Sequence, residues 1–173
     1  ILFMWYTCFM NSSRDSQRSK AYSAEQSIRE SINMADSTGV RTFESCSSVF
    51  EIPQEYKFKN MEDVQHYCDR ALVLVNRANS PVVVRSAHAN QSKAHYLSGG
   101  IYLPNRSTES WAWRELVVLH ELAHHISQGD GHGQNFSGAM VYLVTEMVGA
   151  ELGFLLRMEY LKEGVTLREF QYS

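Results

Sequence analysis

An H-E-x-x-H motif at residues 120–124 (HELAH) constrains this chain more than any other feature of its sequence. Residues four apart lie on one face of an α-helix, about one turn from each other. Two imidazoles in that arrangement can bind a single tetrahedral Zn²⁺ ion. The preceding residues, 115–119, are mostly apolar, which predicts that the motif lies in a buried helix. Because buried polar groups are costly without a partner, a metal site is favoured over a pair of structural histidines.

The residue types of the motif indicate the chemistry of a zinc-dependent hydrolase. His120 and His124 are the candidate metal ligands, and Glu121 points along the flank of the same helical face. Zinc lowers the pKa of a bound water, so that hydroxide is available near neutral pH. A neighbouring carboxylate can accept the proton of that water and pass it to a leaving amine. Glu121 is therefore the candidate catalytic residue.

His132 is the candidate third ligand of a single Zn²⁺ ion, and it lies in a glycine-rich loop after the motif. Gly131 and Gly133 allow the chain to turn sharply and to return the imidazole to the metal. The alternative for His132 is a loop histidine near a helix N-terminus. Glu146 and Glu151 are rival third ligands from the following helix, and Glu151 can instead orient a ligand histidine. Otherwise, both are carboxylates on the flank of a helix.

Other side chains near the motif have weaker claims. His125 points about 100° away from the preceding histidine, which predicts packing or the orientation of a ligand. Tyr142 is a candidate oxyanion stabiliser, as are Tyr102 and Tyr96, although core packing is the favoured interpretation of each. Asp130 is predicted to cap the loop.

The composition is that of one ordinary globular domain. The chain has 173 residues, of which 44% are hydrophobic and 20% charged. A net charge of −3 gives no strong signal for nucleic-acid binding. The three cysteines, Cys8, Cys46 and Cys68, form no C-x-x-C pair, which indicates reduced thiols and a cytoplasmic location.

The first ten residues (ILFMWYTCFM) are apolar but too short to span a bilayer, which takes about 20 residues. No basic segment precedes them, so they do not resemble a signal peptide, and no membrane association is predicted. We interpret residues 1–13 as an apolar extension that is non-native or the edge of a fragment. Residues 14–173 are predicted to form a single domain.

The hydrophobic pattern predicts an α+β fold. Asn60 and Thr108 are the predicted N-caps of two of the helices, and Gly164 ends the last one. Around Gly99 and Gly100, the chain forms either a hairpin or one strand with a bulge. The prediction is thus a short sheet of three or four strands, packed with the H-E-x-x-H helix and a following long helix. The expected helices are 14–32, 60–79, 109–127 and 135–163, and the expected extended segments are 40–52, 81–87 and 94–104.

Several segments together carry a family resemblance. The sequence HELAHH followed by GHGQNF, with RDSQRSKAYSAE near the start and IYLP at residues 101–104, resembles a family of metallohydrolases from actinobacteria and their phages. That resemblance covers about residues 14–164. The pattern of H-E-x-x-H followed by a later histidine is also similar to that of the SprT-like zinc metalloproteases. In that family the later histidine is the third zinc ligand, which corresponds to His132. The resemblance implies a zincin-like domain with an edge strand that can bind an extended peptide.

This chain departs from the SprT-like pattern in two ways. The gap before the third histidine is shorter, and no C-terminal zinc ribbon or DNA-binding tail is evident. A role in DNA repair is therefore not implied. The expected activity is that of a metallopeptidase acting on a peptide or protein substrate, and the oligomeric state is not indicated.

Two readings other than an enzyme remain. One is a non-catalytic, zinc-stabilised binding module, whose structural site would be closed by four protein ligands. Asp130, Glu146 or Glu151 would supply the fourth ligand in that case. The other is a regulator with a zincin domain. Mn²⁺, Fe²⁺ or Co²⁺ can occupy ligands of the same kind.

Overall fold

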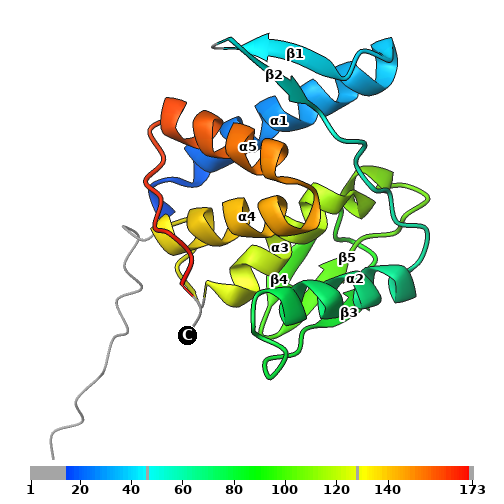
Figure 1. Ribbon diagram of the computed structural model, residues 1–173. Helices are drawn as coiled ribbons and strands as arrows, with labels where there is room; N and C mark the ends of the chain where they lie inside the picture. The colour runs from blue at the N-terminus through cyan, green and yellow to red at the C-terminus, as the bar shows by residue number, and fades with distance from the viewer. Residues whose placement is uncertain (1–14, 46, 128, 172–173) are drawn as a thin grey trace, which may run out of the picture.

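The computed structural model describes residues 15–45, 47–127 and 129–171 of the chain, and it combines α-helices with two small sheets (Figure 1). The expected α+β class is confirmed at this level. The extension at residues 1–13, with Cys8, lies outside the described residues, as does Cys46. The helices and strands are α1 (Arg18–Thr38), β1 (Thr42–Ser45), β2 (Ser48–Glu51), α2 (Met61–Leu74), β3 (Val83–Ser86), β4 (His95–Leu97), β5 (Gly100–Leu103), α3 (Glu115–Ile126), α4 (Gln134–Met147) and α5 (Ala150–Lys162), with a short 3-10 helix at Ser110–Trp113 before α3.

Helix α1 follows the narrow apolar stripe of its sequence but runs further than residue 32. It ends at Thr38, where Gly39 takes a left-handed conformation (φ 72°) and its N–H donates to the carbonyl of Ala35. Such a glycine stop relieves a carbonyl that the helix leaves unpaired. The buried face is apolar except at Glu25. A carboxylate at that position requires partners from elsewhere in the fold.

The larger sheet has the strand order β3-β5-β4, with β3 parallel to β5 and β4 antiparallel to it. Ser98 and Gly99 turn the chain between β4 and β5, and both have positive φ. This is the backbone of a tight two-residue hairpin. Of the two alternatives around Gly99, the hairpin is therefore confirmed, and β4 forms one edge of the sheet.

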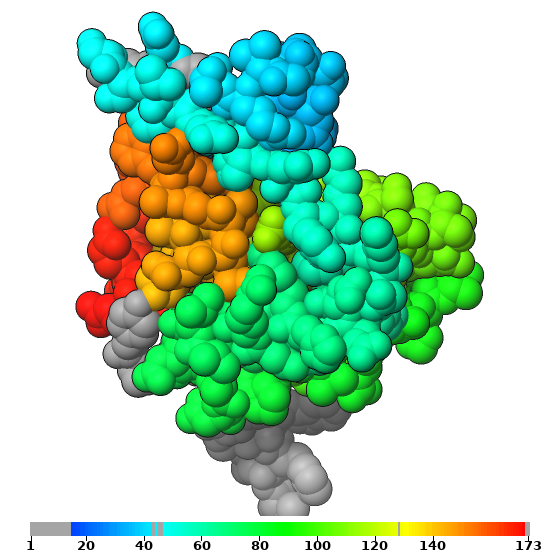
Figure 2. Space-filling model, turned by 45° about the vertical axis from the view of Figure 1, so that its right-hand side comes forward, coloured from blue at the N-terminus to red at the C-terminus, as the bar shows by residue number. Residues whose placement is uncertain are grey.

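Residues 40–52, expected as one strand, form a hairpin of two strands instead. Strands β1 and β2 pair in antiparallel fashion, with Thr42 opposite Glu51, and Ser47 in the turn has positive φ. The loose alternation of apolar and polar residues in this serine-rich segment did not reveal the turn. Two short strands joined by a brief turn give the same alternation as one longer strand. In Figure 2 the hairpin lies at the top of the molecule, above α5.

The helix expected from residue 109 begins later and is capped differently. A 3-10 turn comes first, and Arg114 then takes an extended conformation before α3 starts. The Thr108 hydroxyl donates to the carbonyl of Asn105 and does not cap the helix. The carboxylate of Glu55 accepts the N–H of Leu116 at 3.0 Å and pairs with Arg114. A cap from a distant segment has no local sequence signature, so this expectation was wrong.

The single long helix expected at 135–163 is two helices. The Val144 carbonyl accepts the N–H groups of Val148 and Gly149, just after the end of α4. Gly149 has φ 154°, a conformation largely restricted to glycine. The break lets α5 turn back and pack along α4 (Figure 1). A Cβ on Gly153 would lie 2.0 Å from Oγ1 of Thr145, so the two helices cross closely at this point. The apolar residues that recur at helical spacing over 135–163 are therefore divided between the buried faces of two helices.

Helix α4 packs between α3 and α5, and α1 packs on α5 (Figure 1). Helix α3 also contacts strands β4 and β5, whereas α2 contacts β3, α3 and α4. Nearly all side chains of α3 are buried. The expected burial of the H-E-x-x-H helix is thus confirmed. Among the described residues, no helix combines the length and the apolar character needed to cross a membrane.

Gly138 tests the packing of α4 against the C-terminal segment. An added Cβ would lie 1.7 Å from the carbonyl oxygen of Arg168. Alanine normally stabilises a helix relative to glycine, but this overlap should reverse the sign. We expect Gly138→Ala to lower the free energy of unfolding by about 1–3 kcal/mol in urea denaturation. Ser23→Ala, at an exposed position of α1, is the control and should change it by less than about 0.5 kcal/mol. An unchanged or higher stability of Gly138→Ala would contradict the packing.

Candidate metal centre

Three imidazoles from two segments meet at one point. One ring nitrogen from each of His120, His124 and His132 lies within 4.8 Å of the other two. The first two come from successive turns of α3, and the third comes from the loop between α3 and α4. Nε2 of His132 lies 3.4 Å from Nε2 of His120. Catalytic zinc sites usually have three protein ligands, and three imidazoles are one such set.

The loop returns His132 to α3 through glycine conformations and a side-chain cap. Gly131 has a φ of 59°, in the left-handed region. Asp130 accepts the N–H of Asn135 at 2.7 Å and so caps α4, which confirms its expected role. A Cβ on Gly133 would lie 2.5 Å from this carboxylate, so glycine is needed for the cap to close. The two glycines and the cap together hold His132 in place.

His120 is oriented by Glu25 of α1. Nδ1 of His120 lies 2.8 Å from Oε2 of Glu25, inside the core. The hydroxyl of Tyr160 on α5 donates to Oε1 of the same carboxylate at 2.8 Å. With the proton of Nδ1 committed to this bond, Nε2 of His120 is free to bind a metal. Helices α1, α3 and α5 therefore meet in one buried hydrogen-bond network.

Asp15 orients His132 in the same way. Its Oδ1 accepts from Nδ1 of His132 at 2.7 Å and from the backbone N–H of His132 at 3.1 Å. This leaves Nε2 of His132 to face the other histidines. Sequence reasoning missed both carboxylates. The available signals were Glu25 inside an otherwise apolar stripe, and the presence of both residues in the segment RDSQRSKAYSAE.

The electrostatics favour neutral imidazoles at two of the three positions. Burial, with the neighbouring His120 and His132, lowers the pKa of His124 to about 3. Burial also lowers the pKa of His132, although Asp15 opposes the shift. For His120, burial acts in the same direction, but the charge and hydrogen bond of Glu25, together with the charge of Glu121, outweigh it and raise the pKa. Burial opposes the charged form of Glu25, and His120 nevertheless keeps the pKa of that carboxyl below its usual value.

Glu121 lies beside the histidines, with a side chain that contacts the edge strand β4. It is 6% exposed, and burial raises its pKa against the opposing effects of His120 and the backbone N–H of Tyr96. His125 braces the same strand. Nε2 of His125 lies 2.8 Å from the carbonyl of Ser80, and its Nδ1 lies 3.1 Å from the Tyr96 hydroxyl. His125 therefore positions β4 and is not among the clustered ligands.

A cleft of about 650 Å³ opens beside His120 and Glu121. One wall is α1, and the other is formed by Lys93 and Ala94, just before β4, and by the segment around Trp111. The ring of Tyr22 stacks on His120 at 5.2 Å between centroids and faces the cleft. On the sequence, Tyr22 reads as part of the core stripe of α1, yet it is 39% exposed.

The floor of the site is apolar. The ring centroid of Phe136 lies within 4.9 Å of the centroids of all three histidines. Phe136 is itself fully buried on α4. An apolar base of this kind limits the access of water from below.

The remaining sequence candidates lie elsewhere. Glu146 is exposed on α4, and Glu151, exposed at the start of α5, accepts the backbone N–H of Glu51. Tyr142 stacks on Phe170 at 4.9 Å. The structure does not bring Glu146 or Glu151 to the three histidines, and neither these two nor Tyr142 line the cleft beside them.

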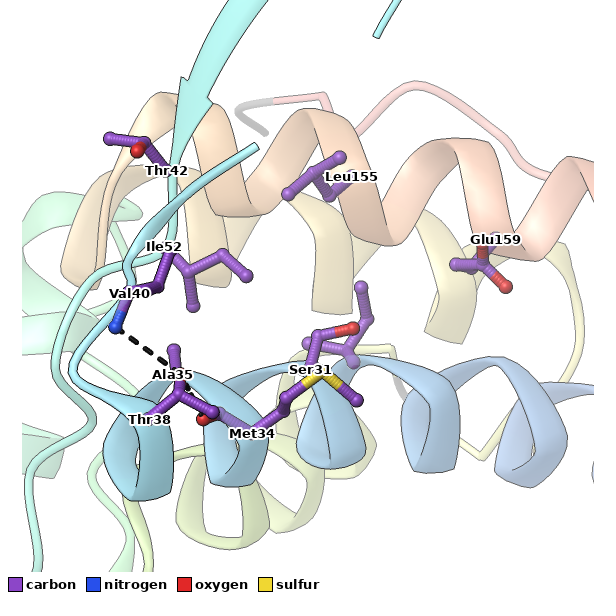
Figure 3. Close-up of a pocket in the computed structure, with 10 residues that line it drawn as sticks. Ser31, Met34, Ala35, Thr38, Val40, Thr42, Ile52, Leu155 and Glu159 are labelled. Atoms are coloured by element: carbon purple, nitrogen blue, oxygen red, sulfur yellow. Dashed lines mark hydrogen bonds between the residues drawn. The ribbon is translucent and has the colours of Figure 1, made fainter. Parts of the chain in front are cut away.

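A second cavity, of about 480 Å³, lies between α1, α5 and the β1–β2 hairpin (Figure 3). Its lining is mostly apolar, with Met34 and Ala35 on α1 and Leu155 on α5. Of the described residues that line it, the carboxylate is Glu159, and none is a histidine or a cysteine. This cavity is separate from the histidine cluster.

Comparisons with known proteins returned no match. A scan against protein-family models, a search of curated proteins and a search of solved structures all gave this result. The resemblance to SprT-like metalloproteases and the zincin-like fold therefore stay predictions.

Tyr160→Phe tests the buried network around Glu25. Removing the hydroxyl leaves one oxygen of a fully buried carboxylate without its donor. We expect the free energy of unfolding to fall by about 1–3 kcal/mol, measured by urea denaturation. Tyr56→Phe, which removes the hydroxyl of a half-exposed tyrosine, is the control and should have little effect. Equal stabilities of the two variants would show that the hydroxyl does not hold the carboxylate.

Proposed function

We propose that this protein is a zinc-dependent hydrolase that cleaves peptide bonds. The observation that carries the proposal is the group of three clustered imidazoles beside a buried carboxylate at a cleft. His120, His124 and His132 would hold the ion, and Glu121 would act as general base and acid. Imidazole ligands suit zinc, although other divalent metals bind such groups as well.

The way the ligands are supported agrees with a metal site. Glu25 and Asp15 each engage the Nδ1 of one histidine, at 2.8 Å and 2.7 Å. Carboxylate–histidine pairs of this kind fix the tautomer and raise the basicity of a metal ligand. A pair of structural histidines in a core needs no third histidine beside it. The shared direction of the free Nε2 atoms of His120 and His132 therefore supports a common ligand.

The chemistry assigned to Glu121 follows from its position. A bound zinc ion polarises a carbonyl and lowers the pKa of a coordinated water. Glu121 would take a proton from the attacking water as the new C–O bond forms, and deliver it to the amine nitrogen as the C–N bond breaks. The Tyr22 hydroxyl, at the cleft, is better placed than that of Tyr142 to donate to the oxygen that becomes negative.

A peptide substrate is supported by the edge strand. Strand β4 is at one edge of its sheet, and Ala94 next to it lines the cleft with Glu121. An extended peptide can add to such an edge through backbone hydrogen bonds. A peptide bound in this way would have an amide bond near the Glu121 carboxylate. A compact zincin-like domain and a cytoplasmic location are part of the same proposal.

The alternative of a non-catalytic module has less support. A structural zinc site is closed by four protein ligands, whereas the described residues bring three together. Asp130 caps α4, and Glu151 accepts a hydrogen bond from β2. The carboxylates of Asp130 and Glu151, two of the three candidate fourth ligands, therefore already accept hydrogen bonds from other groups.

Glu25→Gln tests the metal site independently of activity. The neutral amide lacks the negative charge by which the carboxylate raises the basicity of the His120 imidazole. The affinity for Zn²⁺ should therefore fall about 10–100-fold. The affinity is measured by competition with a chromogenic chelator, and circular dichroism checks folding. Asp15→Asn should have a smaller effect, since Asp15 is more exposed. Glu30→Gln, exposed on α1, is the control. A Glu25→Gln affinity equal to that of Glu30→Gln would contradict the proposed ligand role of His120.

Glu121→Gln tests the catalytic role. The variant should bind Zn²⁺ as the unchanged protein does, while peptide hydrolysis falls by about 10²–10⁴-fold because the general base is lost. Hydrolysis is followed by mass spectrometry of a peptide mixture, and the metal content by elemental analysis. His124→Ala is the companion variant and should lose both metal and activity. Full peptidase activity of metal-loaded Glu121→Gln would refute the mechanism.

A further inference from the structure

The cleft beside Glu121 carries an excess of positive charge although the chain as a whole has a net charge of −3. Its carboxylates are Glu25 and Glu121. A bound divalent cation would increase the positive excess. Local charge of one sign in a cleft with low-dielectric walls selects ligands of the opposite sign. The cations that line the cleft are Arg18, Arg29, Lys93 and Arg114.

Two of these cations are already paired. Arg114 is largely buried and forms an ion pair with Glu55. Arg29 lies 3.8 Å from Glu25 and donates to the side-chain oxygen of Gln26. The charges of both are therefore at least partly neutralised by carboxylates of the protein.

The other two cations are available to a ligand. The Arg18 side chain is 61% exposed and lies 4.0 Å from Asp15, at the limit of an ion pair. Its guanidinium lies over the ring of Tyr22, 5.7 Å from the centroid, and so stands close to the histidine cluster. Lys93 is exposed, and its ammonium has no ion pair or hydrogen bond with any described residue.

Arg18 and Lys93 stand on opposite walls of the cleft. Arg18 is on α1, about 10 Å along the helix axis from Glu25, the residue that orients His120. Lys93 comes directly before Ala94 and β4, the strand beside Glu121. A peptide that pairs with the free edge of β4 would therefore pass between the two cations. The volume of about 650 Å³ suits a short peptide segment.

We propose that the cleft binds peptides with an aspartate or glutamate close to the cleaved bond, through the Arg18 guanidinium and the Lys93 ammonium. This inference rests on the proposed function, because it assigns a substrate class to the same site. An acidic peptide is favoured over a nucleic acid for two reasons. Two available cations are few for phosphate-backbone binding, and the sequence pI is about 6.2.

The test separates binding from hydrolysis. Zn²⁺-loaded Glu121→Gln protein is titrated with three pools of hexapeptides that carry an uncharged fluorophore. The pools are random except for a fixed central Glu, Gln or Lys. Fluorescence anisotropy at low ionic strength should show the Glu pool binding about fivefold more tightly than the Gln pool, the size of one good exposed ion pair. The Lys pool should bind most weakly, and added salt should remove the difference.

Charge variants assign the effect to the two side chains. In the Glu121→Gln background, Arg18→Gln with Lys93→Gln should bring the Glu and Gln pools to equal affinity. Lys20→Gln removes the same charge from α1, outside the cleft, and should preserve the preference. An unchanged preference in the Arg18 and Lys93 double variant overturns the inference. So does displacement of the Glu pool by an equal concentration of a single-stranded oligonucleotide.

Hydrolysis of the same pools by the unchanged protein distinguishes the two proposals. Cleavage of all pools at equal rates overturns the acidic preference and leaves the hydrolase intact. A binding preference for the Glu pool without cleavage of any pool overturns the hydrolase and leaves the acidic site in place. Preferential cleavage of the Glu pool supports both.

Discussion

The hydrogen bond between Glu25 and His120 connects the first helix of the described chain to the helix that carries the H-E-x-x-H motif. Both groups are buried, and neither can lose its partner without a large desolvation cost. Tyr160 brings α5 into the same network. The carboxylate thus fixes the relative positions of three helices and, at the same time, the direction of a ligand nitrogen. The same interaction therefore contributes to the packing of the helices and to the geometry of the candidate metal site.

A second consequence of this arrangement is the asymmetry of the site. Phe136 and the core of α4 close it from below, whereas the side toward α1 and β4 is a cleft. The polar groups on that open side are those that a hydrolase would use: Glu121, the Tyr22 ring beside His120, and the cations of the cleft wall. An apolar base with polar groups only at the opening restricts a reacting ligand to one direction of approach. This asymmetry is the physical reason to favour a catalytic site over a structural one.

Local sequence patterns predicted some elements well and failed where distant segments decide the structure. Asn60 caps α2 through the N–H of Asp63, as its position predicted. The predicted start of α3 was wrong because Glu55, far away along the chain, supplies the cap. The prediction of one long last helix was wrong because the backbone angle of Gly149 ends the helix within a continuous pattern of apolar residues. In each failure, a tertiary contact or a single backbone angle overrode a local periodicity that was itself correct.

The sequence by itself determined the helical spacing of His120 and His124, the place of Glu121 between them, and the glycine loop that can return His132. These follow from the period of the α-helix and from the conformational freedom of glycine, which are local properties. Only the tertiary structure decided that Glu25 and Asp15 orient two of the histidines, that Glu151 faces β2 instead, and which tyrosine reaches the cleft. Those outcomes depend on how α1, α4 and α5 pack, and packing between segments 95 to 117 residues apart leaves no periodic signal in the sequence.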